Sequence, residues 1–219
     1  MSRTPTLLLL VASLLLISIP KSLAYRSLTF IKKEPSKVIL KKGNLQFLKE
    51  EKSILIKYDH SNTKVGAFDR EEDYVNERAT VFNQKEPGRG DKWKKIWEGS
   101  KKKRYQPRFE ASLNKQLARK GINVSQNSKN SQYTLIVKTT SVEAGFDAIV
   151  YINSAFVSYE FFFVETGNES NIVAELYLNN VKSPQPDDSE DYTAESRIAE
   201  SYAKSGKMLG DFIYKAIKK

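Results

Sequence analysis

The sequence has 219 residues, with 36 Lys and Arg against 26 Asp and Glu, one His and no Cys. Without Cys the chain cannot form disulfides, thiolate zinc sites, iron–sulfur clusters or a cysteine nucleophile, and one His excludes His-rich metal sites. We therefore expect no cofactor and no metal site. With 40% hydrophobic residues, the length suits a single globular domain rather than a disordered chain.

The first 24 residues have the pattern of a cleaved secretory signal. Arg3 precedes the apolar run Leu7–Ile19, and small residues at Ser22 and Ala24 match the positions that a signal peptidase reads. The run has 13 residues, fewer than the ~20 needed to cross a bilayer as a helix. We expect cleavage after Ala24, a secreted or periplasmic location, and no transmembrane segment in the mature protein.

Cleavage would remove two basic residues and lower the formal net charge from +10 to +8. In a secreted protein this excess favours an anionic envelope component or another envelope protein as the partner, and it argues against nucleic acid. The alternative is that the charge simply keeps the protein soluble.

Residues 25–53 are rich in Lys, so we expect an extended segment there, irregular or weakly stranded. The remainder, 54–219, is expected to form a single α+β domain. A short strand at Ser53–Tyr58 is closed by the turn sequence Asp59–Asn62. The lone histidine, His60, lies in this turn, where an ordinary surface position is the expectation.

Helices are expected between this strand and the β-rich part of the chain. Acidic residues from Asp69 onward favour a first helix that ends before Pro87. The next helix should span Asp91–Tyr105, with Asp91 as its N-cap. Pro107 interrupts the pattern, so Arg108–Lys120 is either a separate helix or the far half of a kinked one.

From Tyr133 onward the apolar period changes from 3.6 to 2, which indicates strands. Three runs separated by turn sequences predict an antiparallel meander: Tyr133–Val142, Ile149–Glu165 and Ile172–Val181. Both faces of the middle run are apolar near its end, which suggests a central strand covered on two sides. The predicted fold class is α+β, with a mainly antiparallel sheet of three or four strands packed by helices, including a C-terminal helix.

The C-terminal helix is expected at about Tyr192–Ile217. Small residues, Gly206 and Gly210 among them, flank its apolar stripe and would let it approach the sheet closely. The acidic loop Asp187–Asp191 before it could gather a calcium ion, but it lacks the spacing of a calcium-binding loop. Acidic residues are favoured before a helix in any case, so a structural role is the preferred interpretation.

The candidate binding site is the run Lys101, Lys102, Lys103 and Arg104. Consecutive cations of this kind could contact a polyanion such as lipopolysaccharide. The alternative is a solvated helix end, where cations are favoured by the helix dipole. Trp93 and Trp97 could stack on sugars, but their helical spacing favours a place in the core.

Five segments resemble a family of secreted Bacteroidetes proteins without an assigned function. They are Asn44–Leu48, Glu86–Trp93, Arg108–Glu110, Tyr133–Thr140 and Phe163–Thr166. The resemblance covers most of the mature chain, and it implies no catalytic residues.

A more distant resemblance is to periplasmic α/β domains of the TolB amino-terminal and curli-secretion-lipoprotein type. It is carried by a helix ending at Gly121–Val124, the strand Tyr133–Val142, two strands joined at Glu165–Gly167 and a closing helix. Such domains are adaptors and regulators of envelope machines, which implies a similar role here by fold-level analogy. The lipid-anchoring Cys of many of those proteins is missing, so the resemblance implies no membrane tether of that kind.

These features favour a secreted or periplasmic, non-enzymatic binding or adaptor protein of the cell envelope. Two alternatives stay open: a hydrolase that uses a pair of carboxylates on envelope glycans, and a structural subunit of a surface assembly. Two carboxylates in one cleft would favour the hydrolase. An exposed edge of Ile149–Glu165 would favour the structural subunit.

Overall fold

The computed structural model describes residues 35–148, 151–184 and 193–218. The predicted signal sequence and the acidic loop Asp187–Asp191 lie outside the described residues. The strands are β1 (Val38–Gly43), β2 (Ser53–Asp59), β3 (Lys64–Val65), β4 (Asn123–Ser125), β5 (Tyr133–Glu143), β6 (Phe146–Ala148), β7 (Tyr151–Asn153), β8 (Phe156–Glu165) and β9 (Asn168–Lys182). The α-helices are α1 (Glu71–Lys85), α2 (Arg89–Ser100), α3 (Gln106–Leu117) and α4 (Ala194–Lys218).

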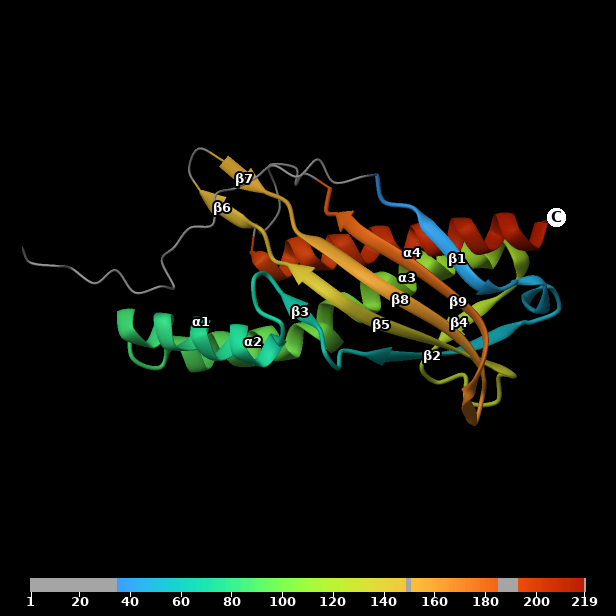
Figure 1. Ribbon diagram of the computed structural model, residues 1–219, viewed down its shortest axis with the longest axis horizontal. Coiled ribbons are helices and arrows are strands. Elements are labelled where there is room, and N and C mark those ends of the chain that lie inside the picture. The colour runs from blue at the N-terminus through green and yellow to red at the C-terminus, as the bar shows by residue number, and fades with distance from the viewer. Residues whose placement is uncertain (1–34, 149–150, 185–192, 219) are drawn as a thin grey trace, which may run out of the picture. The chain divides into compact units, whose positions relative to one another are not determined.

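Seven strands form one mixed sheet in the order β1-β9-β8-β5-β2-β4, and β3 pairs with β5 where β2 has ended (Figure 1). Strands β5, β8 and β9 are the predicted antiparallel meander, whereas β2 runs parallel to both β4 and β5. The α+β class is confirmed. The expected sheet of three or four strands is too small, because β1, β3 and β4 are short and are defined by their pairing partners rather than by their own patterns.

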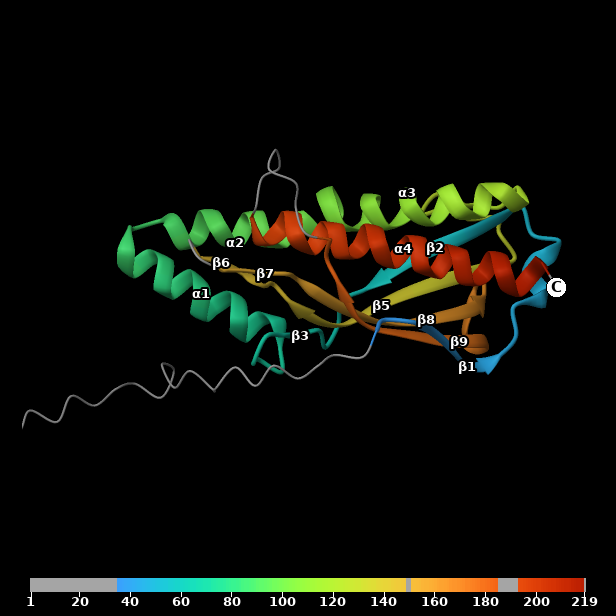
Figure 2. The same ribbon diagram turned by 90° about the horizontal axis from the view of Figure 1, so that it is seen from above.

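Helices α3 and α4 lie side by side across one face of the sheet (Figure 2), and no described helix packs across the other face. On β8, the side chains of Tyr159, Phe161 and Phe163 point to the helices and are fully buried. On the opposite face, Glu160 forms an ion pair with Lys138 of β5. Strand β8 is therefore central, as predicted, but described helices cover it on one side only. Because β8 lies between β5 and β9, this part of the run Ile149–Glu165 has no exposed edge of the kind expected for a structural subunit. Part of the remainder, Tyr151–Asn153, forms β7, which pairs with β6 in a separate two-stranded sheet.

Gly206 and Gly210 of α4 face α3, not the sheet as predicted. A Cβ atom added at Gly206 would lie 2.2 Å from the carbonyl oxygen of Phe109, and one added at Gly210 would lie 2.6 Å from Cβ of Gln116. The glycines therefore set the close approach of the two helices, which together cover the aromatic face of the sheet.

Helices α1 and α2 form a hairpin that extends past the end of the sheet at which β3 lies (Figure 1, Figure 2). Gly88, with φ of 79°, is the N-cap of α2, and Asp91 lies inside the first turn, so the predicted Asp91 cap is wrong. The side chain of Asn83 on α1 caps the helix in place of Asp91, because its Oδ1 accepts a hydrogen bond of 2.7 Å from the N–H of Gly90. A side chain outside the helix thus satisfies one of its unpaired N–H groups.

The segment expected to be weakly stranded contributes the edge strand β1, which pairs antiparallel with β9. A short 3-10 helix, Gln46–Lys49, follows it and buries Leu48 completely in the core. The sheet therefore begins at Val38.

Candidate functional site

The basic run lies in a π-helical segment, Lys101–Tyr105, that joins α2 to α3 without a break. The N–H of Gln106 donates a hydrogen bond to the carbonyl of Lys101, five residues earlier. This wider turn carries the helix past Pro107, which has no N–H to donate to the preceding turn. Of the two alternatives drawn from the sequence, one continuous but irregular helix is present, and π-segments of this kind are frequent at functional sites.

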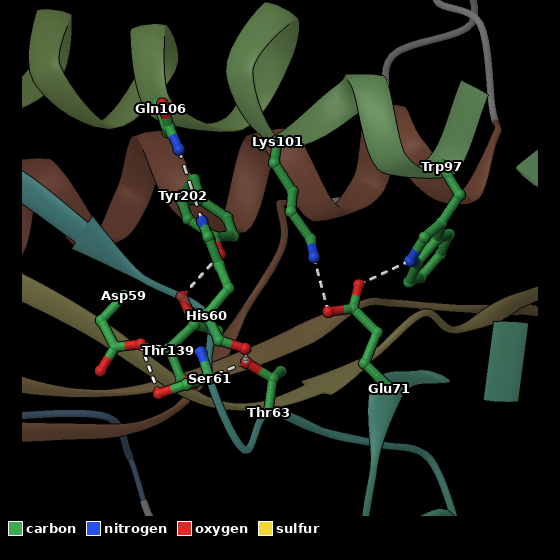
Figure 3. Close-up of polar contacts among 10 residues, drawn as sticks. All are labelled: Asp59, His60, Ser61, Thr63, Glu71, Trp97, Lys101, Gln106, Thr139 and Tyr202. Atoms are coloured by element: carbon green, nitrogen blue, oxygen red, sulfur yellow. Dashed lines mark hydrogen bonds and ion pairs between the residues drawn. The ribbon is translucent and has the colours of Figure 1, made fainter. Parts of the chain in front are cut away.

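Lys101 points into the protein, where its ammonium forms an ion pair with Glu71 (Figure 3). The Nζ–Oε2 distance is 2.6 Å, and the other carboxylate oxygen accepts a hydrogen bond of 2.7 Å from the indole N–H of Trp97. The side chains of Lys101 and Glu71 are only 25% and 16% exposed. Lys101 therefore anchors the first turn of α1 to the π-segment and is separated from the other three cations of the run.

The remaining cations are exposed on the surface. Arg104 makes a long hydrogen bond of 3.5 Å to the hydroxyl of Ser196 on α4. Lys102 and Lys103, by contrast, form no ion pair with any described residue. The same holds for Lys92 and Lys95 of α2, both of which are also exposed.

Three of these four lysines extend along one face of the helix, and the fourth, Lys102, is next to Lys103 in the sequence. Positions 92, 95, 99 and 103 follow one another at three- and four-residue steps, which places Lys92, Lys95 and Lys103 on one face. The side chain of Lys103 lies over Gly99, because its Cδ would be 4.0 Å from a Cβ atom added at that glycine. We call Lys92, Lys95, Lys102 and Lys103 the basic stripe. Lys92 and Lys95 were not among the predicted site residues, although their helical spacing is visible in the sequence.

An apolar side chain interrupts the basic stripe. Ile96 is 55% exposed, and with Leu40 of the edge strand β1 it makes up the exposed large hydrophobic residues of the described chain. Trp93 is half-buried beside it, whereas Trp97 is 2% exposed. The predicted core position is therefore confirmed for Trp97, and Trp93 packs at the rim of the core.

His60 is largely enclosed rather than lying on the surface as expected. Its ring is parallel to that of Tyr58, and its Nε2 lies 3.4 Å from the amide nitrogen of Gln106, at the start of α3 (Figure 3). The pKa of His60 is lowered to about 4, first by burial and second by the nearby Lys101 ammonium, against the opposite effect of Glu71 and Asp59. The imidazole is therefore neutral at pH 7 and can accept the hydrogen bond from Gln106.

Hydroxyl groups hold the turn of His60 against α4. The Thr63 hydroxyl lies 2.9 Å from the carbonyl oxygens of both His60 and Thr139, and the Thr139 hydroxyl lies 2.7 Å from that of Tyr202. Burial raises the pKa of Tyr202 above its ordinary value, so the phenol stays protonated. Within the described ranges, no three His, Asp or Glu side chains are grouped so that they could hold a metal ion. The residues drawn in Figure 3 therefore form a packed polar junction.

The helix-free face of the sheet carries a shallow concavity of about 280 Å³. Its lining residues are Lys41, Thr140, Glu160, Glu175, Tyr177 and Asn179. Glu160 is paired with Tyr177 across β8 and β9, so Glu175 is its diagonal neighbour on the same face, at a typical Cα separation of ~7–8 Å. Both carboxylates are held by lysines, Glu175 by Lys41 at 2.7 Å and Glu160 by Lys138 at 2.8 Å.

Comparison with known proteins identifies no family. No protein-family model and no curated protein matches the chain, so the resemblances drawn from the sequence stay predictions. Solved structures with a similar fold pattern include the PelC dodecamer from Paraburkholderia phytofirmans, with 11% identity and a TM-score of 0.37 over 80% of this chain and 98% of that one.

Two further structures are similar at the same low level. A Xanthomonas campestris protein of the DUF330 family has 9% identity and a TM-score of 0.33 over 76% of this chain and 86% of that one. A homologue of neuraminyllactose-binding hemagglutinin from Helicobacter pylori has 16% identity and a TM-score of 0.27 over 80% and 86% of the two chains. Because all these values are low, the function of this chain has to be inferred from its own residues. No helix in the described ranges is long and apolar enough to cross a membrane.

Proposed function

We propose that the protein is a secreted or periplasmic, non-enzymatic binding or adaptor protein of the cell envelope. It contacts an anionic envelope component through the basic stripe of α2 and the π-segment. The export part of the proposal rests on the pattern of residues 1–24, and the binding part rests on the described surface.

The observation that carries the proposal is the concentration of uncompensated charge on one helix. Positions 89–105 hold eight basic and two acidic residues, in a chain whose formal net charge is +10. The four lysines of the basic stripe have no carboxylate partner among the described residues. Folding has therefore left this charge available to an external anion, whereas Lys101 is already paired with Glu71. Cations clustered on one face raise the local concentration of an anionic partner.

Replacement of the four lysines tests the proposal. We expect Lys92→Gln, Lys95→Gln, Lys102→Gln and Lys103→Gln in one variant to weaken binding to envelope fractions about 100-fold or more, since each cation at an anionic surface contributes about 1 kcal/mol. Native binding should also weaken between about 0.05 and 0.5 M salt, because exposed charges are screened. Cosedimentation measures both effects.

A second variant with the same loss of charge is the matched control. It replaces four exposed lysines outside the stripe that also form no ion pair with a described residue: Lys49, Lys52, Lys115 and Lys129. We expect this variant to bind within about threefold of the native protein. Equal losses in both variants would mean that net charge, and not the basic stripe, determines binding, and the assignment of the site would be wrong.

The carboxylate pair on the helix-free sheet face supports a second candidate function, a glycan hydrolase. Glu160 and Glu175 line one concavity, and glycosidases use a pair of carboxylates that flank the scissile bond. Each carboxylate is ion-paired with a lysine, whereas one partner of such a pair has to be protonated to act as the acid. Binding is therefore the better-supported function.

A hydrolysis assay separates the two candidates. We expect no release of reducing sugar from envelope polysaccharide by the native protein. If sugar is released, and if Glu160→Gln and Glu175→Gln each lower the rate at least about 100-fold while Glu165→Gln does not, the hydrolase is the correct function. Glu165 is an exposed glutamate at the end of the same strand β8 and lines no part of the concavity.

A further inference from the structure

We propose that the anionic partner of the basic stripe is a lipid bilayer, and that Ile96 and Trp93 enter its interfacial region between the lysines. This inference rests on the proposed function and narrows its partner to an anionic membrane surface. The alternative partner with the same charge, a soluble anionic polysaccharide, is separated by the experiment below.

The arrangement of side chains on α2 favours the bilayer. Ile96 is 55% exposed and directly follows Lys95 on the same exposed face, where Lys92 precedes it by four residues. Trp93 lies three residues before Ile96 and is half-buried, so it borders the same patch while its ring packs against Phe82 and Trp97. Lysines on one face together with adjacent aliphatic and aromatic residues are the composition of helices that lie in a membrane interface.

A polysaccharide would account for the lysines but not for the apolar residues between them. An exposed isoleucine alone needs no explanation in a soluble protein, and Leu40 on β1 is such a case. Ile96 differs because it lies among lysines that form no ion pair with a described residue. A bilayer interface accommodates both kinds of group at once, the cations at the lipid phosphates and the apolar side chains just below them.

The position of the helix is compatible with contact to a flat surface. The hairpin of α1 and α2 extends past the sheet, and the described strands do not cover α2 there (Figure 2). The hydrogen bond of 2.7 Å from Trp97 to Glu71 fastens the buried side of the helix to the protein. The exposed side is thus presented by a fixed helix and does not have to be ordered on binding, which preserves affinity.

The experiment compares two probes: vesicles of phosphatidylethanolamine with phosphatidylglycerol, and soluble dextran sulfate. Protein expressed from its full sequence is purified after export, and its N-terminus is verified by mass spectrometry so that no residual leader can bind lipid. We expect Ile96→Ser to weaken vesicle binding about 10-fold, consistent with the transfer of part of an isoleucine side chain out of water, and to leave dextran sulfate binding unchanged. Leu40→Ser, at the other exposed hydrophobic residue, should bind both probes like the native protein.

The two tryptophans supply an independent measurement. Because Trp97 is already buried, a blue shift of the fluorescence on addition of vesicles reports Trp93. We expect this shift with phosphatidylglycerol vesicles and not with dextran sulfate.

Different results would contradict the bilayer proposal and the proposed function. The bilayer is the wrong partner if Ile96→Ser binds the vesicles as tightly as the native protein, if the fluorescence does not shift, or if dextran sulfate alone is bound. In each of these cases the basic stripe remains an anion-binding surface. If the four-lysine variant retains full affinity for both probes, the proposed function itself is overturned.

Discussion

Replacement of Gly206 by alanine is expected to lower the free energy of unfolding by about 2 kcal/mol, although alanine is the better helix former by about 1 kcal/mol. The added Cβ would lie 2.2 Å from the carbonyl oxygen of Phe109, 3.0 Å from its carbonyl carbon and 3.2 Å from the amide nitrogen of Leu113. All three are backbone atoms of α3, so no flexible side chain can move aside. The helices have to separate, and overpacking of this kind typically costs about 1–3 kcal/mol.

The effect extends to the core because Phe109 and Leu113 are completely buried between α3 and the sheet. Separation of α3 from α4 would loosen the contact of Phe109 with Phe161, whose ring centroids are 6.1 Å apart. Urea-induced unfolding followed by circular dichroism measures the change. We expect a lower transition midpoint at an unchanged m-value.

Gly99→Ala is the matched control for this substitution. Gly99 is also helical, but the nearest atom to an added Cβ there is Cδ of Lys103 at 4.0 Å, so the methyl group meets no obstacle. The higher helix propensity of alanine should then dominate and raise the free energy of unfolding by up to about 1 kcal/mol. If Gly206→Ala were as stable as the native protein, the close approach of α3 and α4 described above would be wrong.

The elements with strong local patterns could be predicted from the sequence, and those defined by distant partners could not. The 3-10 turn Ala118–Lys120 that follows α3 ends at Gly121, whose φ of 70° favours glycine, and the β5–β8–β9 meander follows from its alternation. Strand β4 has three residues and is held by β2, about 70 positions away in the sequence. Pairing of this kind depends on the fold as a whole and leaves no local pattern.

The candidate site could likewise be predicted only where it depends on local sequence and not on distant residues. The run of cations was visible, but the inward direction of Lys101 depends on Glu71, which lies 30 residues earlier. The expectation for His60 was wrong for the same reason, because Gln106 lies 46 residues later. The stripe itself was accessible to sequence reasoning, since the positions of Lys92, Lys95 and Ile96 repeat at helical spacing.

Acidification from pH 7 to pH 4 is expected to destabilise the protein by about 3 kcal/mol through His60 alone. Its pKa in the folded protein is lowered to about 4, whereas an unfolded histidine titrates near 6.5. The unfolded state therefore binds the proton more tightly than the folded state. The stabilisation is complete above about pH 6.5 and is lost progressively as the pH falls toward 4, by about 1.4 kcal/mol for each pH unit.

The geometry explains why the folded protein excludes this proton. Protonation would place an N–H group against the amide nitrogen of Gln106 at 3.4 Å, where the neutral ring accepts a hydrogen bond. It would also add a positive charge near the ammonium of Lys101, inside the junction that joins β2 to the π-segment. A charged imidazole in this position is therefore poorly solvated and close to a like charge.

Because His60 is the only histidine, the prediction can be tested without ambiguity. Its imidazole signals in the NMR spectrum should titrate with a midpoint near pH 4, and chemical unfolding between pH 7 and pH 5 should show the loss of stability. The His60→Gln variant, which is neutral throughout, should lose this pH dependence while keeping that of the carboxylates. A midpoint near 6.5, or the same slope in the variant, would show that His60 is solvated and that the junction between β2 and the π-segment is open.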